Sequence, residues 1–320
     1  MSADVRDGQR WSRAQAMKNG ALYALAVTAL TVLRAVPAAW LRTLGRAIAI
    51  AAYALFADAR RTARINIARA LPDLDFHARA ALLFRTYLSL GASLGDTLAM
   101  LRGSGRAQAT RLALDEASRA TLRDAQSEGR GVVFASAHLG PWEAVAAALV
   151  ASGVPLTTLA RESYDPRFTR LYDRLRGAHG VRAIYRGSPG AAARIVRTLR
   201  QNAVLGVPMD LRSRVPSVDA PFLGEPAPTA IGPARIALRT RAAVVVGTAA
   251  PIGAGSEMGV TVTRIPSSDL AADDSGALIL TTRINAEISR RILAMPAAWP
   301  WMHDRFGRTA SPRIAPHHRA

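Results

Sequence analysis

The chain of 320 residues has no cysteine, and Lys18 is the only lysine among its 42 basic residues. The absence of cysteine excludes disulfide bonds and thiolate metal ligands, which is compatible with a reducing compartment. The six histidines include no pair at metal-binding spacing except His317 and His318 near the end of the chain, and no H-E-x-x-H motif occurs. The sequence therefore predicts neither a structural nor a catalytic metal.

Acidic residues are scarce. The chain has 23 Asp and Glu against 42 Lys and Arg, so its formal net charge is +19. Such an excess creates a positive field that attracts nucleic acid, anionic lipid or an acidic carrier protein, and charge alone does not choose among them. Half of the residues are hydrophobic, which is enough for a full core. The length suits one large α/β domain with an appendage or two smaller domains.

No uncharged apolar run reaches the ~20 residues that span a bilayer. Gly20–Leu33 has 14 residues and Ala47–Ala57 has 11. Arginines and aromatic residues such as Trp40 surround both runs, a pattern typical of attachment to a membrane surface. The alternatives are that both helices pack on the domain, that one tilted span extends through Arg34, or that the first run is a cleaved signal. The 19 residues before that run argue against a signal.

The pattern of predicted secondary structure changes near residue 131. Residues 1–125 read as a helical region with membrane-associating helices, residues 126–308 as an α/β domain, and residues 309–320 as a mobile tail. Within the second part, short apolar strands predicted at 132–137, 155–160, 181–185, 203–208, 243–251 and 260–265 alternate with helical segments. Repeated strand-helix units predict a mainly parallel central sheet flanked by helices.

One glycine-rich segment resembles a nucleotide-binding loop without being one. Gly253 to Gly259 joins two predicted strands, opens no helix and lacks the G-x-G-x-x-G spacing. A hairpin turn is the better interpretation.

The segment Gly131 to Glu143 runs an apolar strand into a histidine and places a carboxylate five positions later. His138 is predicted at the carboxyl end of the strand and Glu143 in the first turn of the next helix, with Gly140 as its cap and Pro141 at its first position. Ligands of open α/β sheets bind beyond such strand ends. A carboxylate on one ring nitrogen fixes the histidine tautomer, so the pair is a candidate general base with its orienting partner.

Two other interpretations of this segment stay open. Ser136 lies on the same strand face as His138 by alternation, which leaves an acyl-enzyme route possible although no G-x-S-x-G elbow exists. Alternatively, His138 is a buried structural histidine, and Glu143 is an ordinary acid at a helix start, where the dipole favours it.

Further polar residues follow other predicted strands. Arg161 follows the strand that ends at residue 160, and Asp210 follows the strand that ends at 208, with Arg212 and Arg214 beyond it. A later segment, Thr229 to Gly232, has the composition of a helix start. Because carboxyl ends of parallel strands meet at one edge, these groups are predicted to converge with His138, where arginine forks and a helix amino terminus suit a phosphate.

The ordered set of motifs resembles the bacterial lipid A secondary acyltransferases, which are the lauroyl and myristoyl transferases of the lysophospholipid acyltransferase superfamily. The likeness covers nearly the whole chain. Its motifs are His138-x4-Glu143, the Arg161 strand end, Pro208-Met-Asp210, Pro221-Phe-Leu-Gly224 with Thr229, and Trp301-x-His303-x-Arg305-Phe306.

The resemblance implies direct transfer of an acyl chain from an acyl carrier protein thioester to a hydroxyl of an anionic membrane glycolipid, with no diffusible cofactor. In it, His138 takes the hydroxyl proton and Glu143 orients the imidazole. Arg161, Asp210, Arg212 and Thr229 match positions expected to bind substrate. It also implies work at the cytoplasmic face of the inner membrane, without a nucleic-acid partner.

Two rival functions remain. A lipid or thioester hydrolase could use the same His-Glu pair, and a non-catalytic basic protein could bind membranes or nucleic acid through charge alone.

Overall fold

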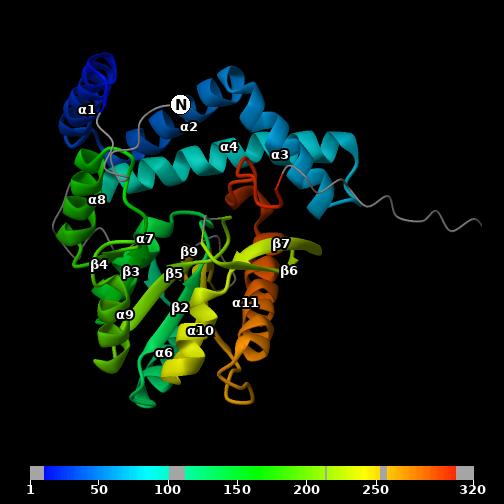
Figure 1. The fold of residues 1–320 in the computed structure, drawn as a ribbon. Helices are drawn as coiled ribbons and strands as arrows, with labels where there is room; N and C mark the ends of the chain where they lie inside the picture. Colours follow the sequence, from blue (N-terminus) through cyan, green and yellow to red (C-terminus); the bar gives the residue numbers. More distant parts are fainter. Residues whose placement is uncertain (1–10, 101–111, 213–214, 253–257, 308–320) are drawn as a thin grey trace, which may run out of the picture.

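The computed structural model describes residues 11–100, 112–212, 215–252 and 258–307 (Figure 1). The predicted tail at 309–320, residues 253–257 of the predicted turn and Arg214 lie outside these ranges. The helices, in chain order, are α1 (Arg13–Leu33), α2 (Ala38–Leu55), α3 (Ala57–Ala70), α4 (Phe76–Ala99), α6 (Glu116–Ser127), α7 (Trp142–Ala151), α8 (Pro166–Ala178), α9 (Ala191–Arg200), α10 (Gly232–Thr240), α11 (Asp274–Ala294) and the 3₁₀ turn η3 (Pro296–Ala298). The strands are β1 (Ala113–Leu114), β2 (Val132–Ser136), β3 (Leu156–Ala160), β4 (Arg182–Tyr185), β5 (Val204–Pro208), β6 (Ser217–Phe222), β7 (Glu225–Ala230), β8 (Ala243–Pro251) and β9 (Met258–Ile265).

Seven strands form the central sheet in the order β1-β9-β8-β2-β5-β3-β4. All neighbours pair in parallel except β8 and β9, which are antiparallel as expected for two strands joined by a hairpin. The predicted α/β class with a mainly parallel sheet is therefore confirmed. β2 lies in the middle of the sheet, with β5 on one side and β8 on the other.

Alternation along β2 explains why helices cover both faces of the sheet. Val133 and Ala135 are buried in a cluster with residues of α9, α10 and α11. Val132 and Phe134 point to the other face, where they pack with α6 and α7. A continuous apolar run rather than a half-polar one is what a strand buried on both faces requires.

The sequence did not predict the two-stranded hairpin of β6 and β7. Six residue pairs, from Ser217 with Ala230 to Phe222 with Glu225, form its antiparallel ladder. Its turn residues Leu223 and Gly224 both have positive φ, 50° and 82°, as a two-residue hairpin turn of the primed type requires. Three prolines in these strands hid the pattern, because proline argues against a strand except at sheet edges, where its missing N–H is not needed.

Helices α2, α3 and α4 lie across one end of the sheet, above α7 (Figure 1). α2 and α4 approach closely through glycines. A Cβ built on Gly91 would collide with the backbone of Gly45, and one on Gly95 with that of Arg42. Small residues at this contact let the two backbones meet directly. The opposite face of α2 is open to solvent, and Trp40 on it is 67% exposed.

Helix α1 has no buried residue in its 21 positions and is the one helix of the described chain long and apolar enough to cross a membrane by itself. The bent pair of α2 and α3 passes the same test only if both count as one span. α1 touches the α/β part through ring contacts: Tyr23 meets Phe168 edge to face at 5.7 Å, and the Arg167 guanidinium lies 4.9 Å from the Tyr23 ring. The predicted division of the chain at 125 and 126 stays a prediction. β1 precedes that division and α6 (Glu116–Ser127) runs across it, and both pack with β9.

Candidate active site

His138 lies two residues beyond β2, in the short turn that enters α7. Gly140 has a φ of +64°, which favours glycine, and its N–H donates to the carbonyl of Ala298 at 3.0 Å. Pro141 is the N-cap of α7, where the sequence predicts Gly140. The helix therefore begins at Trp142, one residue later than predicted. The strand and this pinned turn together hold the imidazole at the carboxyl edge of the sheet, with its side chain 25% exposed.

Asp210 is the partner of His138. β2 and β5 are parallel neighbours, and their register sets Ser136 opposite Pro208, so the residues two positions later also meet. The His138 ring Nδ1 lies 2.9 Å from Asp210 Oδ1, and the His138 backbone N–H donates to Asp210 Oδ2 at 2.9 Å. The carboxylate thus holds both the ring and the backbone of the histidine.

Trp299 completes the surroundings of that carboxylate. Its indole Nε1 donates to Asp210 Oδ2 at 2.9 Å, and both Trp299 and Asp210 are fully buried. A buried carboxylate needs such donors because it has lost its water.

The electrostatics of this pair favour its charged form. Burial acts to lower the pKa of His138, but the charge and hydrogen bond of Asp210, with a smaller contribution from Glu143, outweigh burial and raise it. Burial acts to raise the pKa of Asp210, yet His138 and the hydrogen bond from Trp299 outweigh it and lower this pKa. With Nδ1 held by an ionised carboxylate, Nε2 is the nitrogen left to exchange a proton, and it has no hydrogen-bond partner among the described residues.

The expected hydrogen bond between Glu143 and His138 is not formed. Glu143 instead accepts a bidentate pair of bonds from Arg176 of α8, at 3.0 Å from Nε and 2.6 Å from Nη2. Glu143 is 8% exposed, and the guanidinium fork occupies both of its oxygens. The carboxylate that orients His138 is therefore the one from the neighbouring strand end.

Ser136 forms no hydrogen bond with His138. Its hydroxyl donates to the carbonyl of Gly247 on β8 at 2.9 Å. This arrangement lacks the contact between nucleophile and base that an acyl-enzyme route requires.

Arg161 and Arg212, two other predicted site residues, are both exposed and form no hydrogen bond with the histidine ring in the part of the chain that the structure describes. Arg161 is exposed just after β3, and its charge helps burial to lower the pKa of Arg186. Arg212 is exposed and lies 3.3 Å from the Asp304 carboxylate. Neither forms a hydrogen bond with His138 or Asp210 among the described residues, so their convergence on His138 and their role in binding substrate stay predictions.

Thr229 lies in strand β7 rather than at a helix start, because α10 begins at Gly232. It is 1% exposed, and its hydroxyl oxygen accepts from Asn285 at 3.0 Å and from Arg305 at 2.7 Å. Arg305 is fully buried, stacks on Phe222 at 4.3 Å, and burial lowers its pKa to about 10. These contacts join the segment that contains Arg305 to the hairpin of β6 and β7.

The sequence did not predict two residues of this site. Trp299 and Arg176 belong to segments 89 and 33 residues away from their partners. The one signal for Trp299 is its place beside the Trp301 motif; nothing near Arg176 sets it apart from other arginines. Within the described ranges, no group of three or more His, Asp or Glu is placed to hold a metal.

Comparison with known proteins gives a family match. A comparison with curated proteins found no match. The family described as bacterial lipid A biosynthesis acyltransferase matches residues 12–308, which include all the elements of the site. That match spans well over half of the chain, and the chain therefore belongs to the bacterial lipid A biosynthesis acyltransferase family.

Proposed function

We propose that this acyltransferase moves an acyl chain from an acyl carrier protein thioester to a hydroxyl of a lipid A-type glycolipid, with His138 as the general base. The observation that carries the proposal is the bond between His138 Nδ1 and the buried Asp210 carboxylate, which leaves Nε2 unbound. A carboxylate in that position sets the tautomer and stabilises the imidazolium that forms.

The transfer balances without a cofactor. Nε2 of His138 takes the proton from the acceptor hydroxyl while the hydroxyl oxygen attacks the thioester carbonyl. The carbon–sulfur bond then breaks, and the imidazolium returns the proton to the departing thiolate. The thioester supplies the free energy, and the ester stays on the lipid.

Glu143 has a supporting role in this proposal. Its ion pair with Arg176 fixes the start of α7 against α8, just after the turn that holds His138. Arg161 and Arg212 are proposed as exposed cations that attract the anionic substrates rather than as groups at the reacting atoms.

The proposed location is the cytoplasmic face of the inner membrane. It is supported by the exposed apolar side chains of α1 and α2 and by the net charge of +19, which suits anionic lipid and an acidic carrier protein. Nucleic acid is not proposed as a partner.

His138→Ala tests the mechanism. Purified protein, acyl carrier protein carrying chains of several lengths and a glycolipid acceptor should yield acylated lipid, measured by mass spectrometry. We expect His138→Ala to lose about 10³-fold or more in kcat, because the base is removed. His77→Ala is the matched control, since His77 is exposed at the start of α4, and it should keep full activity.

The products separate this function from its rival. Retained transfer in His138→Ala contradicts the proposed base. Free fatty acid formed at the same rate with and without the glycolipid would instead indicate a hydrolase.

A further inference from the structure

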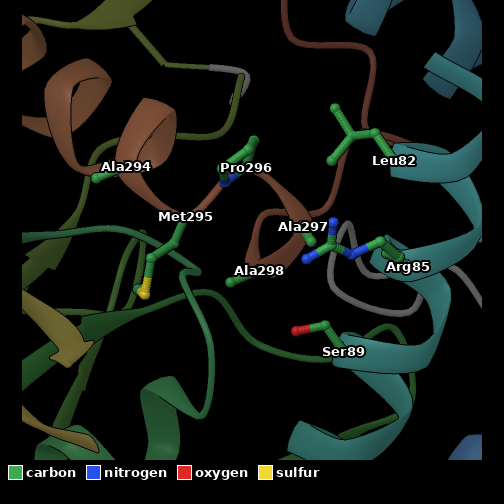
Figure 2. Close-up of a pocket in the computed structure, with 8 residues that line it drawn as sticks. All are labelled: Leu82, Arg85, Ser89, Ala294, Met295, Pro296, Ala297 and Ala298. Atoms are coloured by element: carbon green, nitrogen blue, oxygen red, sulfur yellow. The ribbon is translucent and has the colours of Figure 1, made fainter. Parts of the chain in front are cut away.

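A cavity of about 290 Å³ lies between α4 and the segment 294–298, which joins the end of α11 to η3 (Figure 2). Leu82, Arg85 and Ser89 line it from α4, one turn apart along the helix. The facing wall consists of alanine, methionine and proline side chains. Its volume is close to the lower end of the roughly 300–1,000 Å³ typical of ligand pockets.

The polar groups of this cavity all come from one wall. Figure 2 shows the Arg85 guanidinium and the Ser89 hydroxyl extending from α4 toward residues 297 and 298. Arg85 is exposed and has no hydrogen-bonded or charged partner in the part of the chain that the structure describes. The cavity has no acidic lining residue. An unpaired cation and a hydroxyl donor facing an apolar wall suit an anion that carries a hydrocarbon portion.

The cavity adjoins the candidate active site through its apolar wall. Ala298 lines the cavity, and its carbonyl accepts from Gly140, two residues after His138. The next residue, Trp299, donates to Asp210. A ligand held here therefore lies beside the turn that holds the histidine.

We propose that this cavity binds the phosphate-bearing headgroup of a lipid, with Arg85 and Ser89 on the phosphate and the wall of residues 294–298 on its apolar portion. The proposal rests on the proposed function, because that function brings an anionic lipid to His138. The shared chemistry is a phosphate, which a lipid or a free anion could supply.

Binding to the intact chain in a neutral detergent tests the proposal, with calorimetry as the readout. The probes are decyl phosphate, inorganic phosphate and decyl maltoside. We expect Arg85→Gln to weaken decyl phosphate binding about tenfold, since one charge-assisted hydrogen bond contributes roughly that much. Decyl maltoside should bind Arg85→Gln and the unaltered chain equally.

Two more variants test the apolar wall of the cavity and provide a control for the loss of an arginine. Ala297→Leu narrows the cavity from the apolar wall and should also weaken decyl phosphate binding. Arg239→Gln, which removes an exposed arginine of α10, should leave it unchanged. An unchanged affinity in Arg85→Gln overturns the site. Inorganic phosphate binding as tightly as decyl phosphate overturns the lipid headgroup in favour of a free anion.

The binding test of the cavity and the activity test of His138 can fail independently of each other. If His138→Ala keeps full activity while Arg85→Gln loses decyl phosphate binding, the mechanism fails and the cavity stands. If Arg85→Gln binds normally while His138→Ala is inactive, the cavity fails and the mechanism stands. In an active enzyme, Arg85→Gln should raise the acceptor KM about tenfold and change kcat little, because the guanidinium binds ground state and transition state alike.

Discussion

Asp210 determines how His138 can act. It is fully buried, and its two oxygens are divided between the imidazole Nδ1, the histidine backbone N–H and the indole of Trp299. Each of these donors favours the ionised carboxylate, and the ionised carboxylate favours a protonated imidazole. A single buried charge thus sets the tautomer of the His138 imidazole and raises its pKa.

Asp210→Asn should reduce kcat by about 10³- to 10⁴-fold, because the neutral amide no longer stabilises the imidazolium. It should also move the pH profile. His138 accepts a proton only when neutral, so activity falls as pH drops through its raised pKa. Without the Asp210 charge that pKa decreases, and the acidic limb of kcat/KM should shift to lower pH, measured in residual activity with concentrated enzyme.

Asp304→Asn is the matched control for this substitution. Asp304 is 38% exposed and pairs with Arg212 rather than with the histidine. Its replacement should alter neither kcat nor the acidic limb. An Asp210→Asn enzyme with an unmoved limb and less than about tenfold loss of kcat contradicts the pairing.

Helices α7 and α8 are joined by the ion pair of Glu143 and Arg176. Their side chains are only 9% and 20% exposed. A charge buried to this extent is stable while its partner is present and unfavourable when it is alone. The pair also affects the imidazole of His138, because the charge of Glu143 acts to raise its pKa and that of Arg176 acts to lower it.

Arg176→Gln should lower the free energy of unfolding by about 3 kcal/mol, because it leaves Glu143 buried without a counter-charge. The loss of the nearby cation should also raise the pKa of His138 and move the acidic limb of kcat/KM to higher pH. Denaturant unfolding and a pH–rate profile measure the two effects.

The double variant Glu143→Gln with Arg176→Gln distinguishes the effect of the charge pair from the effect of changing the size of the two side chains. It removes both charges and should recover most of the lost stability and return the acidic limb toward its original position. Equal instability in the single and double variants contradicts a role for the charge pair.

The whole molecule combines an α/β layer with an apolar helical layer that keeps much of its hydrophobic surface outward. Leu25 and Val32 of α1 are 67% and 61% exposed, and Trp40 of α2 is 67% exposed. The positive net charge adds long-range attraction to anionic surfaces. Hydrophobic insertion and charge should therefore make separable contributions to membrane binding.

Leu25→Glu combined with Val32→Glu should weaken binding to phosphatidylglycerol vesicles by at least about tenfold, since burying each apolar side chain contributes roughly 1.5–3 kcal/mol. The remaining binding should be abolished by high salt, which screens charge, whereas the unaltered chain should keep part of its binding. Vesicle co-sedimentation at two ionic strengths measures both.

Leu278→Glu changes a 40% exposed leucine on α11 and should leave vesicle binding unchanged. If the α1 double variant binds as the unaltered chain does at both ionic strengths, α1 does not insert.

Much of the fold followed from the sequence because it depends on local pattern. The apolar run of β2 predicts a strand buried on both faces, and the strand predicted at residues 203–208 coincides with β5 to within one residue. The hairpin of β6 and β7 was missed because its prolines oppose the usual strand composition. Alternation and helix signals span a few residues, so a linear chain displays them.

The sequence by itself determined that a histidine follows an apolar strand, that no cysteine takes part, and that the chain is strongly basic. The tertiary structure decided which carboxylate serves that histidine. Glu143 is close in sequence but is paired with Arg176, while Asp210, 72 residues away, meets His138 because β5 lies beside β2 in register. The order of strands in a sheet depends on packing across the whole domain, and no local spacing contains it.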